Sequence, residues 1–163
     1  MNVLIDDQFA GITAAEYESL YFDEDFNRAV GRALRMGRLL LHFERTDSRI
    51  QRKVQYEPER DPDSPAGQAF GKSRASFIEE LDYDRATRRG AWRTIPNLFP
   101  DRVSNAGTIE FIDAPGGVQR IVRGEVKVSL FGFGRMIERM IVTEIKKSYE
   151  NTTRFTNEWL AKR

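Results

Sequence analysis

The sequence has no cysteine and a single histidine, His42, and these scarcities exclude several kinds of protein. A disulfide framework, a cysteine nucleophile and a zinc site of cysteine and histidine ligands cannot be built from it. The 26 lysines and arginines nearly balance the 25 aspartates and glutamates, so a protein whose main task is to bind nucleic acid is not expected. We accordingly expect no metal and no cofactor.

Long apolar runs and targeting signals are lacking as well. No stretch approaches the roughly 18 consecutive apolar residues that a membrane-spanning helix needs. The segment Met1–Asp7 has neither a positive region nor a long apolar one, so we predict a cytoplasmic protein without a secretory signal. A length of 163 residues suits one domain over 1–163, large enough to bury a core without disulfides.

Charge is distributed unevenly along the chain. Residues 1–30 carry seven acids and one arginine, whereas residues 120–163 carry ten basic residues and five glutamates. Two interpretations remain open. Either the acidic start and the basic end pack near each other or form solvated faces, or the separation of charge orients the protein at an anionic membrane.

The start of the chain predicts a strand over 3–9 and then two short helices. Thr13 and Glu16 form a capping box that begins the first helix. Asp23 or Asp25 suits the start of the second helix, which Gly37 is predicted to end. Apolar residues recur in both segments at helical spacing. They are Tyr17, Leu20, Tyr21, Phe26, Val30, Ala33 and Leu34.

The middle of the chain has the alternation of a sheet. Leu39, Leu41 and Phe43 share one parity, and a strand with an apolar face over 50–56 follows a turn at 46–49. Prolines and glycines in 57–73 predict a long loop. Four further strands are predicted over 75–84, 88–95, 107–113 and 118–130, with a hairpin turn at 113–117.

One long helix is predicted over 135–161, because neither proline nor glycine interrupts an apolar stripe at three- and four-residue steps. This order of elements predicts an α+β fold in which a curved antiparallel sheet of about seven strands wraps around the C-terminal helix. The two short helices follow the first strand. Strong curvature would leave a ligand cavity between helix and sheet.

Residues 107–110 (Gly-Thr-Ile-Glu) and 123–138, in which a long strand enters the last helix through a glycine-containing turn, resemble a bacterial START-like family of unknown function. The whole chain resembles the START-like superfamily. This is the helix-grip or SRPBCC fold of steroidogenic acute regulatory-type lipid-transfer domains, polyketide cyclases and pathogenesis-related plant proteins. Residues 12–34 are similar to the start of the VASt lipid-transfer domains of sterol transporters. The resemblance implies a helix-grip fold with a cavity, and because these are fold motifs it transfers no ligand and no catalytic residue.

Charged residues share the parity of apolar neighbours on several predicted strands. Arg52, Glu79, Arg93 and Glu110 would then face the interior as a buried pair or as a group that binds a ligand's polar head. The alternative places these charges on the outer face, and the apolar neighbours of Glu110 favour it there. For the helix residues the alternative to a cavity is ordinary core packing. The predicted cavity residues are Arg52, Val54, Tyr56, Phe77, Glu79, Leu81, Arg93, Val122, Val126, Met136, Ile137, Met140 and Ile141.

Four large apolar residues lie in predicted loops. Leu98 and Phe99 stand between two prolines, and Phe131 and Phe133 stand beside glycines before the last helix. Loops rarely expose such residues without a partner, so we predict a gate that contacts a membrane transiently. The alternative is that these side chains fold back and close the end of the barrel.

The first hypothesis for function is a carrier without catalytic residues, which binds a lipid or sterol-like molecule and transfers it between membranes. The second is a polyketide cyclase or dehydratase that uses His42, Glu79, Arg93 or Tyr56 for acid–base chemistry. The third is a regulatory module whose ligand changes partner binding. His42 has no acid at a recognisable spacing, so we expect it to be structural.

Overall fold

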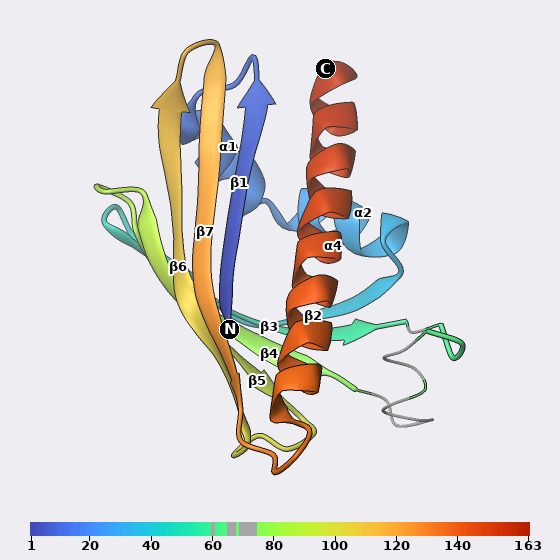
Figure 1. Ribbon diagram of the computed structural model, residues 1–163. Coiled ribbons are helices and arrows are strands. Elements are labelled where there is room, and N and C mark those ends of the chain that lie inside the picture. Colours follow the sequence, from blue (N-terminus) through green and yellow to red (C-terminus); the bar gives the residue numbers. More distant parts are fainter. Residues whose placement is uncertain (60, 65–67, 69–74) are drawn as a thin grey trace.

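A computed structural model describes residues 1–59, 61–64, 68 and 75–163 of the protein. Figure 1 shows a strongly curved sheet with one long helix lying across its inner face and two short helices near one end. In chain order the elements are β1 (Asn2–Ala10), α1 (Ala14–Tyr21), α2 (Glu24–Ala33), β2 (Met36–Arg45), β3 (Arg49–Pro58), β4 (Phe77–Asp84), β5 (Arg89–Pro96), β6 (Val103–Ala114), β7 (Gly117–Val128) and α4 (Gly134–Ala161).

The described strands form one antiparallel sheet in the order β1-β7-β6-β5-β4-β3-β2. Strands β2 to β7 therefore follow one another as a meander, and β1 pairs with β7 at one edge. This confirms the predicted α+β fold, a seven-stranded sheet around a C-terminal helix. The β3 strand runs to Pro58, into the predicted loop over 57–73, and residues 60, 65–67 and 69–74 of that loop lie outside the described residues.

Two glycines face each other on the paired strands β6 and β7. Gly107 of β6 and Gly124 of β7 are register partners. A Cβ added to Gly107 would lie 1.8 Å from the Arg123 carbonyl oxygen, and one added to Gly124 would lie 2.7 Å from the ring of Trp92. Side chains at these positions would force the neighbouring backbone and the Trp92 ring away, so the two glycines permit the close approach seen here.

The capping box of Thr13 and Glu16 begins α1 as predicted, and Asp23 caps α2. The prediction that Gly37 ends α2 is wrong. The helix stops at Ala33, Arg35 takes a left-handed backbone with a φ of +52°, and Gly37 already belongs to β2. An arginine therefore holds the position that glycine usually holds after a helix.

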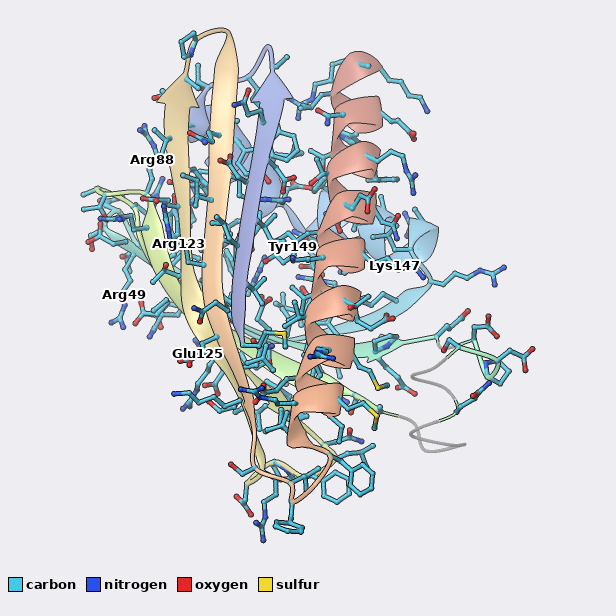
Figure 2. The ribbon with its side chains drawn as sticks, viewed as in Figure 1. Arg49, Arg88, Arg123, Glu125, Lys147 and Tyr149 are labelled. Carbon is cyan, nitrogen blue, oxygen red and sulfur yellow. The ribbon has the colours of Figure 1, made fainter. Side chains whose placement is uncertain are left out.

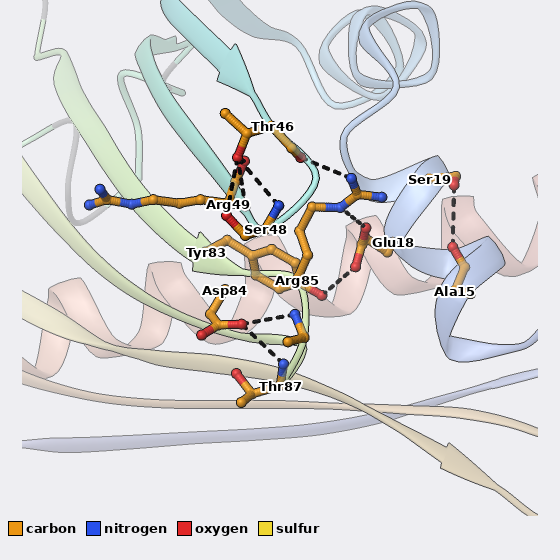
Figure 3. Close-up of polar contacts among 11 residues, drawn as sticks. Ala15, Glu18, Ser19, Thr46, Ser48, Arg49, Tyr83, Asp84, Arg85 and Thr87 are labelled. Atoms are coloured by element: carbon orange, nitrogen blue, oxygen red, sulfur yellow. Dashed lines mark hydrogen bonds and ion pairs between the residues drawn. The ribbon is translucent and has the colours of Figure 1, made fainter.

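A buried acid attaches α1 to the turn after β4. Glu18 is 5% exposed and accepts hydrogen bonds from the Tyr83 hydroxyl (3.0 Å) and Arg85 Nε (2.9 Å), as Figure 3 shows. Arg85 also donates to the Thr46 carbonyl oxygen at 2.9 Å. Glu18, one of the seven acids in residues 1–30, thus has a structural role inside the fold.

The alternating apolar residues of 39–43 do not form a buried strand face. A bulge between Leu40 and His42 shifts the register of β2, and Leu39, Leu41 and Phe43 are all exposed. Because β2 is an edge strand, its far end extends beyond the core. None of the helices in the described residues is both long and apolar enough to cross a membrane.

Candidate functional site

A cavity of about 530 Å³ lies between α4 and the inner face of β3, β4 and β5, with α2 at its side. This volume is in the range of small-molecule sites, which run from about 300 to 1,000 Å³. Most of the wall is apolar. Its apolar and aromatic members include Val30, Leu34, Tyr56, Phe77, Trp92, Val103, Leu130, Ile137, Met140, Ile141 and Ile145.

An ion pair lies at the centre of the sheet side of this cavity. Arg52 Nη2 donates to Glu79 Oε1 at 2.9 Å, and the Arg52 side chain is only 4% exposed. The guanidinium also lies over the rings of Tyr21 (5.0 Å) and Phe22 (5.3 Å). Burial alone would lower the pKa of Arg52, but the neighbouring tyrosines and Glu79 outweigh it and raise that pKa, so Arg52 keeps its charge.

A second buried arginine, Arg120, also lines the cavity. Arg120 donates to Asp7 (2.5 Å), the Tyr17 hydroxyl (2.9 Å) and the Thr153 hydroxyl (2.8 Å). It thereby joins β7 to β1, α1 and α4, and its carbon Cζ lies 4.9 Å from the ring centre of Tyr149. The predicted cavity residues omit Arg120, although it has the parity of Val122 and Val126, which they include.

Buried polar atoms without a partner concentrate in this cavity. Among the described residues, such side-chain atoms belong to Arg38, Arg52, Asn105 and Arg120, and all four residues line the cavity. A buried donor or acceptor without a partner costs free energy. The wall is therefore mainly apolar with a few polar side chains built into it, which suits a ligand that is mainly apolar and carries polar atoms.

Three tyrosines add hydrogen-bond donors to the wall. Burial, with the charge of Glu79 second, raises the pKa of Tyr56 to about 12. Burial also raises the pKa values of Tyr21 and Tyr149. Figure 2 shows Tyr149 between α4 and the sheet, while Arg49, Arg88 and Arg123 lie beyond the opposite face of the sheet. At neutral pH these phenols are protonated, so they can donate to a ligand but cannot serve as bases.

The structure separates the predicted cavity residues into three groups. Seven line the cavity: Arg52, Tyr56, Phe77, Glu79, Ile137, Met140 and Ile141. Four pack into the buried interior and are not among the lining residues: Val54, Leu81, Val122 and Val126. Two lie outside the cavity: Met136, which is exposed, and Arg93.

The prediction that Arg93 of β5 faces the cavity is wrong. Its Nε lies 2.5 Å from Glu80 Oε2 on the outer face of the sheet. Trp92 and Thr94 face the cavity instead, because the large ring of Trp92, not the smaller Ala91 and Ile95, sets the inner face of this strand. Glu110 also lies outside, where it pairs with Arg89 and Arg123, as its apolar neighbours indicated.

The four predicted gate residues lie in two neighbouring loops. A hydrogen bond joins these loops, because the Ser129 N–H donates to the Arg102 carbonyl oxygen at 2.8 Å. Leu98 and Phe99 line the cavity. Phe131 and Phe133 do not. They are 103% and 63% exposed, so the alternative in which they fold back over the barrel end is wrong. Phe99 itself is 55% exposed and has a left-handed φ of +54°.

His42 has no place in the cavity. It lies exposed on β2, with Nε2 3.8 Å from Glu44 Oε2, and it is not among the lining residues. The part of the chain that the structure describes also contains no group of three or more histidine, aspartate or glutamate side chains arranged to hold a metal ion.

A curved antiparallel sheet that encloses a cavity with its C-terminal helix defines the START-like, helix-grip class, and solved structures show the same fold. A START superfamily protein from Mycobacterium smegmatis has a TM-score of 0.62 and 17% identity over 98% of both chains. The Zhui aromatase/cyclase from Streptomyces sp. R1128 has a TM-score of 0.65 and 11% identity over 97% of this chain and 93% of that one. A protein from Thermus thermophilus has a TM-score of 0.63 and 12% identity over 97% of this chain and 95% of that one.

Residues 11–160 match the family model described as "Protein of unknown function (DUF2505)", so the chain belongs to that family. No curated protein matches the chain. The similarity to the solved structures, at 11–17% identity, establishes the fold alone.

Proposed function

We propose that the protein binds one hydrophobic, lipid-like molecule in the cavity and transfers it between membranes. The observation that carries this proposal is a largely apolar cavity of about 530 Å³ in which buried arginine and asparagine atoms lack partners. Such a wall suits an apolar body with a few oxygen atoms, as lipids and sterols have.

Apolar burial would supply the affinity. At about 25 cal/mol per Å², a ligand that buries roughly 300 Å² of apolar surface gains about 7 kcal/mol. The entropy lost on association removes part of that gain, so apolar burial of this extent alone gives a dissociation constant weaker than about 10 μM, and polar contacts must supply the rest. Protonated tyrosines and Arg52 would then orient the polar atoms of the ligand.

The aromatic end of the molecule supports a membrane step. Phe99, Phe131 and Phe133 are exposed; Arg102 lies in the loop of Phe99, and Arg135 lies in the first turn of α4 beside Phe133. Aromatic side chains insert at the boundary between headgroups and acyl chains, and arginines favour anionic lipids. Leu98 and Phe99 also line the cavity, so a loop that contacts the membrane is continuous with the site of the ligand.

Transfer of a fluorescent phospholipid or sterol between two vesicle populations tests this function. We expect the wild-type protein to accelerate transfer and the Phe99→Ser/Phe133→Ser variant to slow it at least fivefold with its fold intact. Phe43→Ser is the matched control, because Phe43 is an exposed phenylalanine on β2, outside both loops. Transfer that is unchanged in the double variant contradicts the gate, and a lack of transfer by the wild type contradicts the carrier.

The cyclase alternative has its own observation. Tyr56, Arg52 and Glu79 meet in the cavity wall, so a donor, a cation and a carboxylate are available to a carbonyl-bearing substrate. In that reaction Arg52 and Tyr56 would polarise a carbonyl while Glu79 accepts a proton. His42 and Arg93, the other candidates, are outside the cavity. Turnover of a poly-β-ketone substrate that Glu79→Gln abolishes would favour the enzyme over the carrier.

A further inference from the structure

A second depression, of about 590 Å³, lies on the surface between the end of α2 and the start of β2. Four arginines line it: Arg28, Arg32, Arg35 and Arg38. We call this depression the basic groove. It adjoins the cavity, because Arg38 and three further residues line both.

Arg38 is the link between the basic groove and the cavity. Its side chain is 5% exposed, and Nη1 donates to Glu24. Its Nε and Nη2 atoms are buried and have no hydrogen-bond partner among the described residues. A guanidinium presents its donors in a rigid fork that matches the oxygens of a carboxylate or a phosphate. A buried arginine that Glu24 holds in place and that lines both the groove and the cavity therefore suits an oxyanion.

The balance of charge in the groove points the same way. Glu24 is shared between Arg38 and Arg28, whose Nε lies 3.6 Å from it. Within the described chain, Arg32 and Arg35 form no ion pair with a carboxylate. With Glu59 as the lining acid, four arginines face two carboxylates, so the groove carries a net positive charge.

Backbone strain gives an independent indication. Arg35 has a φ of +52°, a conformation that favours glycine, and its carbonyl oxygen accepts from the Glu59 N–H at 3.0 Å. Strained residues persist where the surrounding structure fixes them, and they concentrate at binding sites. An arginine in place of glycine at this helix end adds a guanidinium to the groove at a cost in stability.

We propose that the basic groove binds the anionic group, a phosphate or a carboxylate, of an amphiphile whose apolar chain occupies the cavity. This inference rests on the proposed function and names its ligand class. Arg38 contacts the anion directly, Arg35 and Arg32 attract it, and the apolar wall on the cavity side of Arg38 receives the chain.

Three probes test the inference: dodecyl phosphate, 1-dodecanol and inorganic phosphate, with binding measured by tryptophan fluorescence in a Trp159→Phe background, so that the signal comes from Trp92, which lines the cavity. We expect dodecyl phosphate to bind at least tenfold more tightly than dodecanol, and inorganic phosphate to bind far more weakly than either. Arg38→Met should remove most of the advantage of the phosphate, a loss of about tenfold to a hundredfold. Arg93→Met is the matched control, because Arg93 also pairs with one glutamate but lies on the outer face.

Arg35→Gly is a second variant with opposite effects on two readouts. It should weaken dodecyl phosphate binding severalfold and yet raise the melting temperature by about 2–4 °C, because glycine relieves the left-handed backbone. This variant keeps the inference testable if Arg38→Met fails to fold. Unchanged phosphate binding in Arg35→Gly contradicts the role of Arg35.

The outcomes separate this inference from the proposed function. Equal affinity of the wild type for dodecyl phosphate and dodecanol overturns the anion site and leaves the cavity as a site for neutral ligands. Binding of inorganic phosphate as tightly as dodecyl phosphate overturns the amphiphile and indicates a site for a free anion. Failure of both chain compounds to bind overturns the proposed function together with this inference.

Discussion

Replacing Arg52 and Glu79 separately and together with methionine distinguishes what their ion pair does for stability from what it does for ligand binding. The pair joins β3 to β4 at 2.9 Å, with side-chain exposures of 4% and 21%. Methionine has a similar reach and no charge, so the double variant fills the same space with apolar atoms.

The magnitudes follow from the difference in burial. Glu79→Met leaves the more deeply buried Arg52 without its carboxylate and should cost about 3 kcal/mol. Arg52→Met leaves the partly exposed Glu79, which water can solvate, and should cost about 1–2 kcal/mol. The double variant should lie within about 1 kcal/mol of the wild type, because replacing both partners removes the cost of an unpaired charge.

Urea unfolding of the four proteins, combined as a double-mutant cycle, measures these free energies. Vesicle-to-vesicle transfer of the same proteins measures function. We expect the double variant to be stable and to bind a polar lipid at least tenfold more weakly than the wild type. A double variant as unstable as the sum of the single variants would refute the reasoning on stability. A stable double variant with wild-type lipid binding would refute a role of the pair in recognising the ligand.

Three further predictions concern pH, strain and close packing. Because the pKa of Tyr56 is raised to about 12, its contribution to stability is complete below pH 10 and is lost between about pH 10 and 12. Tyr56→Phe should therefore reduce the loss of unfolding free energy by about 1 kcal/mol between pH 10 and 11, as urea unfolding at both values would measure. Phe99→Gly should raise the melting temperature by about 2–4 °C, since φ is +54°, while slowing transfer; a lowered melting temperature contradicts the strain argument. Gly107→Ala should lower the free energy of unfolding by about 3 kcal/mol or prevent folding, because the added Cβ would lie 1.8 Å from a carbonyl oxygen. A variant that denatures near the wild-type urea midpoint would contradict this.

The fold was predictable because its signals are local. Hairpin turns between alternating segments specify an antiparallel meander, and an uninterrupted apolar stripe specifies the long C-terminal helix. The same alternation predicted which side chains of β3 and β4 point inward, and it put Arg52 and Glu79 on the same inner face. Alternation failed on β5, where Ala91 and Ile95 are apolar but lie on the outer face and Trp92 faces inward.

The site was only partly predictable, because it depends on distances between segments far apart in the chain. The inward position of Arg120 could have been predicted, because Arg120 has the same parity as the buried valines of β7. A cavity between helix and sheet was predicted from the curvature of the sheet, but its volume and its full lining depend on how far the long-range packing separates α4 from the strands. The basic groove needs the close approach of α2 to β2, where a Cβ on Gly31 would already lie 3.0 Å from the Met36 carbonyl oxygen.

Native mass spectrometry after exposure to a lipid extract tests the central claim most directly, with Ser148→Trp as the variant and Ser104→Trp as its control. Ser148 lines the cavity from α4, whereas Ser104 is exposed on β6, so one tryptophan fills the cavity and the other does not. The account predicts one lipid bound per wild-type and Ser104→Trp molecule and none in Ser148→Trp. A wild-type protein that carries no lipid, or a Ser148→Trp variant that carries as much as the wild type, would contradict it.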